Sequence, residues 1–379
     1  MEQLRVLHCP TNTAGNAQGL ADGERAIGLR SHVVAFHPGP FGMQTDEVLW
    51  ADDPSLPRRE LRRFRLLWRA CREFDVIHFA FGLTIMPSWV PRVEYSPASE
   101  SGALRALWQT YTKLVEQRDL PLLRHLGKTI VVTFQGDDAR QGDRLHNFDV
   151  SPLATLDEAY YQPEVDAHKR VRIERFARYA DQIFALNPDL LHVLPEGASF
   201  LPYASVDPQE WKPGPPQRGE TVLVHAPSHQ GAKGTRFVVE AVDRLRADGI
   251  PLQFELVENV DRAEARKTYA RATLVVDQLL AGWYGAFAVE AMALGKPAVC
   301  FIRRDDLAFV PDEMRRQLPI VNAMPETLYT VLHELLTGPP ERLEELGRRG
   351  RAYVERWHDP RRIAATARSA YERNRERAA

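Results

Sequence analysis

Residues 277–290 contain the groups best suited to bind a phosphate. Gly282 and Gly285 allow tight turns on either side of an aromatic pair that includes Tyr284, and a helix-forming run begins at Ala286. The first N–H groups of a helix have no partner within it and carry roughly half a positive charge. The pattern therefore predicts an anion site at the start of this helix.

The same stretch offers side chains on both sides of the predicted anion site. Asp277 ends a buried strand predicted at 273–277, and Phe287 continues the first helical turn. Glu290 lies one turn further, where its carboxylate can accept hydrogen bonds from ribose hydroxyls. These residues predict a nucleotide site. The alternative is an ordinary strand–helix–strand crossover with a glutamate on its surface.

A second phosphate-binding loop is predicted between a strand at 221–225 and a helix at 236–248. Ser228 and His229 can donate hydrogen bonds, and Lys233 places an ammonium at the end of the loop. A lysine is a point charge on a flexible stem, which suits a diphosphate. The alternative is a loop lysine that is merely solvated.

Two loops of the first half follow predicted strands and carry further candidates. Gly15 and Asn16 follow a strand at 4–9, where the glycine would let a helix N-terminus approach a ligand. A strand at 129–134 runs into a polar segment, and polar residues at the carboxyl end of a strand are where sites are built. The candidates of this segment are Gln135, Asp137, Asp138 and Arg140. For Asp138 and Arg140, the alternative is a structural ion pair that closes the loop.

Strands that alternate with helices along 379 residues predict an α/β protein with two domains. Proline and glycine crowd the segment 203–216, which we take as the boundary between them. The net charge of −2 gives no general bias toward nucleic acid. Three well-separated cysteines in apolar patterns, and a strand that starts near the N-terminus, favour a cytoplasmic protein without a signal peptide. No Cys/His cluster has zinc spacing.

The segment 57–74 carries seven arginines, with Leu61, Phe64, Trp68 and Cys71 at helical spacing. A basic amphipathic helix can lie on an anionic membrane surface. The alternative, which we favour here, is a helix whose apolar residues pack inward while its arginines are solvated.

The segment from Gly285 to Val299 resembles the donor-sugar loop of retaining GT-B glycosyltransferases of family 4. That loop reads Glu-Gly-Phe-Gly, four residues, then Glu-Ala-Met-Ala-x-Gly-x-Pro-Val. Further likenesses are the segment at 135–140, similar to His-Gly-x-Asp-x-Arg, and the Lys-Gly pair at 233–234. Three positions depart from the family: Gly282 replaces its first acid, Gln135 its histidine and Ser228 its phosphate-side arginine.

The resemblance implies a GT-B fold, with two Rossmann-like domains that face each other across a cleft. The expected units are an acceptor-side domain at 1–203, a nucleotide-sugar domain at 204–355 and a helical segment at 356–379 that crosses back to the first domain. The implied reaction moves a sugar from a nucleotide diphosphate to an acceptor hydroxyl with retention, in cell-surface glycan or natural-product glycoside synthesis. No metal or other cofactor is expected, since the chain has no Asp-x-Asp triplet.

The resemblance assigns catalytic roles to Lys233, Glu290, Gln135 and Asp138. It assigns donor binding to Gly15, Asn16, Ser228, His229, Asp277, Gly282, Tyr284, Gly285, Ala286, Phe287 and Glu290, and the acceptor side to Gln135, Asp137, Asp138 and Arg140. The expected partners are a nucleotide sugar and a small-molecule, glycan or lipid-linked acceptor, with peripheral membrane contact through 57–74 as the less favoured interpretation of that helix. One alternative is a non-catalytic GT-B partner subunit, favoured by the three departures. The other is a GT-B sugar-nucleotide epimerase that uses Asp137, Asp138 and His229.

Overall fold

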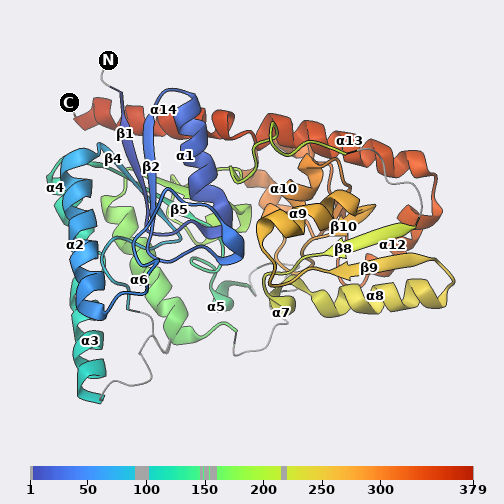
Figure 1. Cartoon of the computed structure of the whole chain (residues 1–379), viewed down its shortest axis with the longest axis horizontal. Helices are drawn as coiled ribbons and strands as arrows, with labels where there is room; N and C mark the ends of the chain where they lie inside the picture. The colour runs from blue at the N-terminus through green and yellow to red at the C-terminus, as the bar shows by residue number, and fades with distance from the viewer. Residues whose placement is uncertain are drawn as a thin grey trace.

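A computed structural model describes residues 3–89, 102–145, 160–214 and 220–378, together with Phe148 and Leu153. The chain forms two α/β lobes that lie side by side along the long axis of the molecule (Figure 1). Each lobe is built around one parallel sheet with helices on its faces. The predicted α/β class with two Rossmann-like units is therefore confirmed.

The sheet of the N-terminal lobe has the strand order β3-β2-β1-β4-β5-β6-β7. β4 shows why these segments form strands: all of its side chains are buried, as in a parallel strand covered by helices on both faces. The order reverses next to β1, because β2 lies on one side of it and β4 on the other. The strands are β1 (Arg5–Cys9), β2 (Arg30–Ala35), β3 (Glu47–Val48), β4 (Val76–Ala80), β5 (Thr129–Phe134), β6 (Gln182–Ala185) and β7 (Ser199–Phe200).

The sheet of the C-terminal lobe has the order β12-β11-β10-β8-β9. Its order reverses next to β8, which pairs with β9 on one side and β10 on the other. The strands are β8 (Thr221–His225), β9 (Leu252–Leu256), β10 (Leu274–Val276), β11 (Ala298–Cys300) and β12 (Val321–Asn322). In such sheets, ligands bind outside the carboxyl ends of the strands where the order reverses.

The helices follow the strands as crossover connections and cover both sheets (Figure 1). In the N-terminal lobe they are α1 (Asn16–Ala26), α2 (Leu56–Glu73), α3 (Gly102–Val115), α4 (Asp119–His125), α5 (Gly142–Leu145) and α6 (Pro163–Tyr179). In the C-terminal lobe they are α7 (Gln230–Lys233), α8 (Thr235–Ala247), α9 (Arg262–Arg271), α10 (Ala286–Ala293), α11 (Asp312–Gln317), α12 (Leu328–Thr337) and α13 (Pro340–Trp357). α3 and α4 were not predicted from the sequence.

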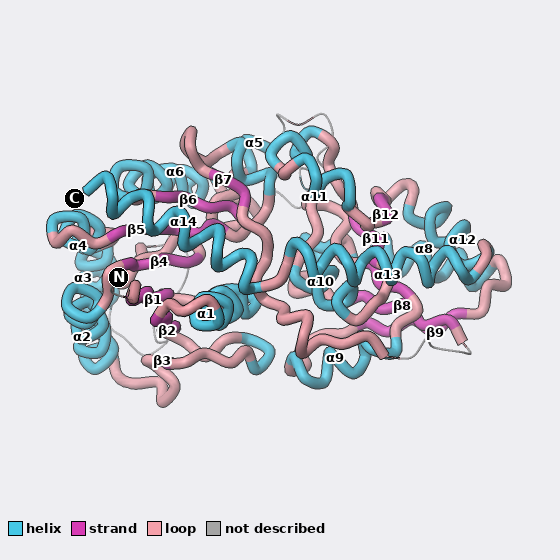
Figure 2. The backbone as a smooth tube through the Cα atoms, turned by 90° about the horizontal axis from the view of Figure 1, so that it is seen from above, coloured by secondary structure: helices cyan, strands magenta, loops and turns pink. Residues whose placement is uncertain are grey.

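The last helix, α14 (Pro360–Ala378), returns to the N-terminal lobe, as the resemblance implied. Figure 2 shows α13 over the C-terminal lobe and α14 over the N-terminal one. Ile363 and Ala367 of α14 pack with Leu20 of α1 in one apolar cluster. Buried Tyr371 donates a hydrogen bond to Glu24 of α1 at 2.7 Å. α14 therefore belongs to the core of the first lobe.

The inward packing predicted for the apolar residues of α2 is wrong. Leu61, Phe64 and Trp68 are 52%, 48% and 60% exposed, whereas Leu66 and Ala70 are fully buried. The apolar side chains at 61, 64 and 68 share one helical face, so they form an exposed stripe. Within the parts of the chain that the structure describes, no helix combines the length and apolar character needed to cross a bilayer.

Candidate functional site

A pocket of about 400 Å³ opens between the two lobes. Loops that follow β1, β2, β4 and β5 contribute its wall in the N-terminal lobe, and loops that follow β8, β9 and β10 form the opposite wall. It therefore includes the carboxyl ends of β8 and β10, where the strand order of the second sheet reverses. The predicted residues that line it are Gln135, Asp137, Arg140, Ser228, His229, Lys233, Asp277, Gly285, Ala286, Phe287 and Glu290.

The first turn of α10 faces this pocket through Ala286 and Phe287. The N-cap residue, Gly285, has no side chain to cap the helix, and its own N–H donates to the carboxylate of Asp277 at 2.5 Å. The N–H groups left for an anion at the predicted site are therefore those of Ala286 and Phe287. A Cβ at Gly285 would lie 3.3 Å from Asp277 Oδ2 and 3.4 Å from Lys233 Nζ. Glycine at this position therefore keeps both side chains close to the helix start.

Lys233 is the last residue of α7 and lines the same pocket. Gly234 follows with φ +80°, a conformation that favours glycine, and the chain then enters α8. The Lys233 ammonium donates a hydrogen bond to the amide oxygen of Gln278. This bond fixes a positive charge beside the start of α10, where a diphosphate would need one.

Glu290 lies one turn into α10 and is only 6% exposed. Its carboxylate accepts a hydrogen bond from Nε of Arg262 at 2.7 Å. Burial raises the pKa of Glu290 from its ordinary value, and the charge of Arg262 offsets part of that effect. The sequence analysis missed Arg262, because nothing in the spacing pairs the first turn of α9 with α10. One end of Glu290 is thus held in place while the residue lines the pocket.

Two tyrosines that the sequence did not reveal hold Asp137 in place, and one of them, Tyr160, lines the pocket. Tyr160 and Tyr161 donate to the two oxygens of Asp137 at 2.6 and 2.8 Å. The Tyr160 ring also meets the His229 ring at 5.3 Å, which joins the two walls. Desolvation alone would raise the pKa of Asp137, but the charge of Arg140 and the two hydroxyl bonds lower it. Asp137 is therefore an ionised group held by its neighbours.

Arg140 is positioned by an ion pair at the edge of the pocket. Its guanidinium binds both carboxylate oxygens of Asp189, at 2.6 and 3.2 Å. The Arg140–Asp138 pair considered from the sequence does not form. The fork of Arg140 is instead held by Asp189, so the residue braces the loop after β5.

Asp138 does not line the pocket, although it was predicted as catalytic. Its carboxylate accepts the backbone N–H groups of Gln135 and Gly136, at 3.0 and 2.6 Å. Burial raises the pKa of Asp138 to about 6, although these bonds oppose the shift. Asp138 shapes its own loop and is unable to reach a substrate in the pocket. Gln135 does line the pocket, and its buried Nε2 has no partner among the described residues.

Tyr284 and Gly282, both predicted to contact the donor, point elsewhere. Tyr284 is fully buried, and its hydroxyl bonds Tyr353 and His358 at 3.1 and 2.9 Å. Gly282 has φ +81°, and a Cβ there would meet Arg303 at 3.1 Å. The turn around Tyr284 thus sends the aromatic side chain into the core, which the residue pattern did not reveal.

Gly15 and Asn16 were also predicted to contact the donor, but they lie behind the pocket wall. Asn16 Oδ1 accepts the N–H of Ala204 at 2.8 Å and so binds the linker between the lobes. A Cβ at Gly15 would be 3.3 Å from both Arg262 Nη1 and Met43 Sδ. Arg262 and Met43, which do line the pocket, separate Gly15 from it. Gly15 and Asn16 thus support the site without lining it, whereas Thr13 and Ala14 of the same loop do line the pocket.

No model of a protein family and no curated protein matches the chain. Solved structures resemble it over nearly its whole length. Sucrose-phosphate synthase from Thermosynechococcus elongatus has a TM-score of 0.59 at 14% identity, covering 98% of this chain and 99% of that chain. Anabaena HepE, solved with UDP and glucose, has a TM-score of 0.59 at 12% identity, covering 98% and 100%. A glycosyltransferase from Rickettsia africae ESF-5 has a TM-score of 0.58 at 9% identity, covering 99% of each chain. The shared fold is the two-lobed GT-B fold.

Proposed function

We propose that the chain is a GT-B glycosyltransferase that transfers a sugar from a nucleoside diphosphate to an acceptor hydroxyl with retention. The observation that carries the proposal is the uncapped start of α10, which faces the cleft with Lys233 beside it and Glu290 one turn deeper. A diphosphate on the helix start leaves the ribose within reach of Glu290. The diphosphate and the ribose of the donor thus both find partners of matching chemistry along one helix.

In the proposed step, the bond between the anomeric carbon and the diphosphate oxygen breaks. Its electron pair stays on the diphosphate, the acceptor oxygen bonds the same carbon, and the hydroxyl proton passes to the leaving phosphate. Negative charge therefore grows beside Lys233 and the N–H groups of Ala286 and Phe287. Fixed donors aimed at such a charge lower the barrier by about 3–4 kcal/mol each in comparable sites. Glu290 positions the nucleotide and takes no part in bond breaking.

The donor we propose is a UDP-sugar. HepE, which shares the fold, was solved with UDP and with UDP-glucose. In this chain the loop at 258–260 and Tyr269 line the far end of the pocket. The Tyr269 ring lies 4.7 Å from the Phe287 ring, so an aromatic surface borders the nucleotide side of the site. Aromatic surfaces of this kind suit a base.

We propose that the reaction needs no metal, because Lys233 supplies the positive charge that a bridging ion would otherwise give. The three free cysteines agree with a reducing compartment, so we place the reaction in the cytoplasm.

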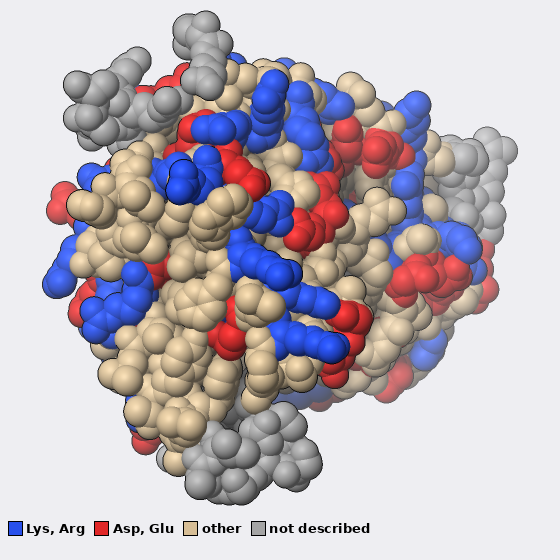
Figure 3. Space-filling view, turned by 60° about the vertical axis from the view of Figure 1, so that its left-hand side comes forward, with Lys and Arg blue, Asp and Glu red and all other residues tan. Residues whose placement is uncertain are grey.

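We also propose that α2 rests on an anionic membrane surface. The exposed residues Leu61, Phe64 and Trp68 lie beside Arg65 and Arg72 on one face of the helix. Figure 3 shows this end of the molecule, where Lys and Arg side chains border a broad uncharged area. Apolar side chains flanked by arginines are typical of helices that lie in the headgroup region.

A non-catalytic GT-B partner subunit is the second candidate. The observation that favours it is Asp277, whose carboxylate binds the N–H of Gly285 and adds negative charge next to the phosphate site. Gly282 also supplies no acid to the cleft. Such a subunit would bind a nucleoside diphosphate weakly or not at all, and it would never release one from a nucleotide sugar. The epimerase alternative loses support, because Asp138 is absent from the pocket lining.

A thermal-shift screen against UDP, GDP, ADP and the matching nucleotide sugars tests the proposal. A ligand at a hundred times its Kd adds about 2.7 kcal/mol to the free energy of unfolding. We expect UDP to raise Tm and UDP-glucose to be hydrolysed slowly to UDP without acceptor. Binding without any UDP release would support the partner subunit. The absence of any nucleotide effect would refute the glycosyltransferase and leave the partner subunit.

A further inference from the structure

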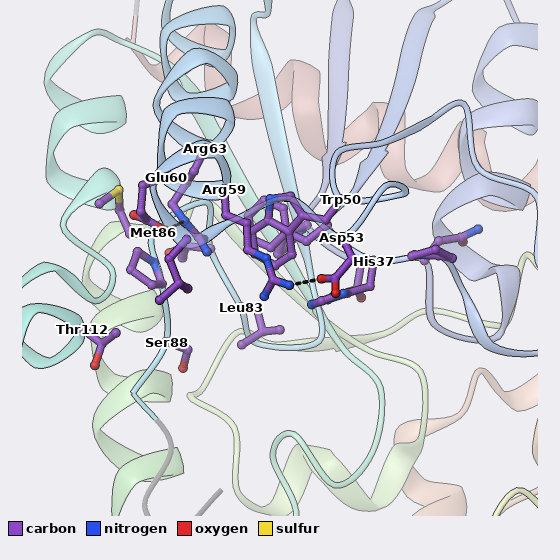
Figure 4. Close-up of a pocket in the computed structure, with 18 of the residues that line it drawn as sticks. His37, Trp50, Asp53, Arg59, Glu60, Arg63, Leu83, Met86, Ser88 and Thr112 are labelled. Atoms are coloured by element: carbon purple, nitrogen blue, oxygen red, sulfur yellow. Dashed lines mark hydrogen bonds and ion pairs between the residues drawn. The ribbon is translucent and has the colours of Figure 1, made fainter. Parts of the chain in front are cut away.

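The N-terminal lobe contains a second hollow, with a volume of about 640 Å³, away from the groups assigned above. The loops that follow β1, β2 and β4 form one side of it, and α2 and α3 form the other (Figure 4). β1 lies between β2 and β4, so the hollow sits at the carboxyl ends of the strands where the order of the first sheet reverses. Open α/β sheets bind their ligands at this position.

The lining of this hollow is mainly apolar. Phe36 and Trp50 stack at 4.6 Å on one side, and Leu83, Met86 and Trp108 add further apolar surface. Figure 4 shows Trp50 at the centre, between Arg59 and His37. A hollow of this size, lined by aromatic and aliphatic side chains, suits an apolar group of a small molecule.

The charged side chains of the hollow are paired with one another. Arg59 binds Asp53, as the dashed line in Figure 4 marks. Arg63 donates to Glu60 at 2.9 Å, and Glu60 also accepts the hydroxyl of Tyr111 at 2.7 Å. The Arg63 guanidinium lies 4.5 Å from the Phe36 ring. Because each charge already has an opposite partner, the hollow matches an uncharged ligand better than a phosphate or carboxylate.

The hollow adjoins the cleft pocket through Thr13, which lines both. The hydroxyls of Thr11 and Thr13 lie 3.2 Å apart and form a polar edge between the two spaces. A ligand whose apolar part fills the hollow would therefore place a hydroxyl at the side of the cleft. This is the end of the ligand that a transferase acts on.

We propose that this hollow binds the uncharged, apolar part of the acceptor, and that the acceptor is an alcohol with an aromatic or alkyl body. The inference rests on the proposed function and names the acceptor class that it left open. The apolar body packs against Trp50, Leu83 and Trp108, and the hydroxyl points past Thr13 toward the transferred sugar.

Binding of N-phenyl-1-naphthylamine, a neutral fluorescent probe, tests the hollow without turnover. Leu83→Trp fills the space, and we expect it to weaken probe binding at least tenfold. Leu114→Trp makes the same change at a position that is 64% exposed, and it should leave binding unchanged. Equal probe affinity in wild type and Leu83→Trp would overturn the proposal.

A series of primary alcohols that displace the probe tests the ligand class. Each added methylene should strengthen displacement about three- to fourfold as long as it is buried. Trp108→Ala should flatten this dependence, whereas Trp68→Ala, which removes an exposed tryptophan, should not. This pair also covers the case in which Leu83→Trp fails to fold. Displacement that does not depend on chain length would contradict the proposal.

Donor measurements separate this inference from the proposed function. In Leu83→Trp, UDP binding and the slow hydrolysis of UDP-glucose should stay at the wild-type level, while transfer to octanol falls at least tenfold. If wild type binds no nucleotide but Leu83→Trp still abolishes probe binding, the proposed function fails and the hollow stands. If transfer to octanol survives in Leu83→Trp, the acceptor assignment fails and the donor site stands.

The apolar alcohol has two sources, the bilayer and the solution, and Trp68→Ala distinguishes them. With a long-chain alcohol in vesicles of phosphatidylcholine and phosphatidylglycerol, loss of transfer in Trp68→Ala identifies a bilayer source. If Trp68→Ala lowers transfer to octanol in solution by the same factor, the effect does not come from the bilayer. That result would contradict the placement of Trp68 outside the hollow.

Discussion

The two sheets reverse their strand order in the same way, yet the hollows at the two reversal points differ in chemistry. Next to β8 the pocket contains Lys233, Glu290 and the uncapped start of α10. Next to β1 the hollow is mainly apolar, and its charges are paired. The topology of a parallel sheet thus fixes where a hollow forms, and the side chains of its loops decide what the hollow can bind.

The largest effect is expected from a substitution that removes the Lys233 ammonium from the pocket of the C-terminal lobe. We expect Lys233→Ala to lower kcat for transfer about a hundredfold, because the leaving diphosphate loses its cationic partner. Glu290→Ala should lower kcat/KM at least tenfold by loosening the ribose. Steady-state kinetics with the donor found by the thermal-shift screen measure both changes.

Lys267→Ala is the matched control, because this lysine is 72% exposed on α9. Its kcat should equal that of wild type. Near-normal turnover in Lys233→Ala and Glu290→Ala together would show that the pocket of the C-terminal lobe is not the donor site.

Asp138 also follows a strand of the first sheet, but its carboxylate binds only backbone N–H groups of its own loop. Burial raises its pKa from an ordinary 3.8 to about 6, so the folded state holds the proton more tightly. Its stabilising effect is complete below about pH 4 and is lost as the pH rises through 6. The free energy of unfolding should fall by ~3 kcal/mol more over this window in wild type than in Asp138→Asn.

Chemical denaturation at several pH values between 4 and 7 measures this difference. Asp119 and Asp306 also have pKa values raised to about 6, so only the difference between the two proteins is informative. Parallel pH profiles would show that Asp138 ionises normally. UDP binding should be alike in both proteins.

A substitution at Tyr371 tests the buried hydrogen bonds that join α14 to α1 and β4 in the N-terminal lobe. Its hydroxyl bonds Glu24 at 2.7 Å and His78 of β4 at 2.8 Å, and His8 of β1 bonds Glu24 at 2.8 Å. Tyr371→Phe should lower the free energy of unfolding by about 2 kcal/mol, because buried polar groups lose a partner. Tyr329→Phe, at a tyrosine near the surface of the other lobe, should change it by less than about 0.5 kcal/mol.

Trp68→Ala gives the smallest expected change and concerns the outer face of α2. We expect its partition onto vesicles of phosphatidylcholine and phosphatidylglycerol to weaken about tenfold, as apolar surface is lost from the contact. Val239→Ala removes an exposed apolar side chain from the other lobe and should have no effect. If wild type does not float with such vesicles, the membrane proposal for α2 is wrong.

The sequence predicted the pocket of the C-terminal lobe better than the hollow of the N-terminal lobe, and the reason is physical. Lys233, Gly285 and Glu290 lie in two short segments whose glycines and helix starts can be recognised from the local sequence. The hollow near β1 draws Thr13, Trp50 and Leu83 from separate segments that only tertiary packing brings together. A site of this kind cannot be recognised from a local sequence pattern.

The errors within the predicted site have a related cause. Asp138 and Tyr284 have side chains that could contact a substrate, and they follow strands where sites are often built. In the fold, however, neighbouring protein groups form hydrogen bonds with both side chains and keep them out of the pocket. Asp138 is taken by two backbone N–H groups, and Tyr284 turns into the core to meet His358. The face of α2 was misjudged because Leu61, Phe64 and Trp68 share the spacing of a packed stripe while being exposed. Spacing identifies a face, but it does not identify the partner of that face.

A crystal structure of the protein with UDP tests the central claim most directly. The account predicts that the β-phosphate oxygens lie about 3 Å from the N–H of Phe287 and from Lys233 Nζ, with the ribose hydroxyls on Glu290. A UDP molecule bound with its phosphates away from the start of α10 would contradict it.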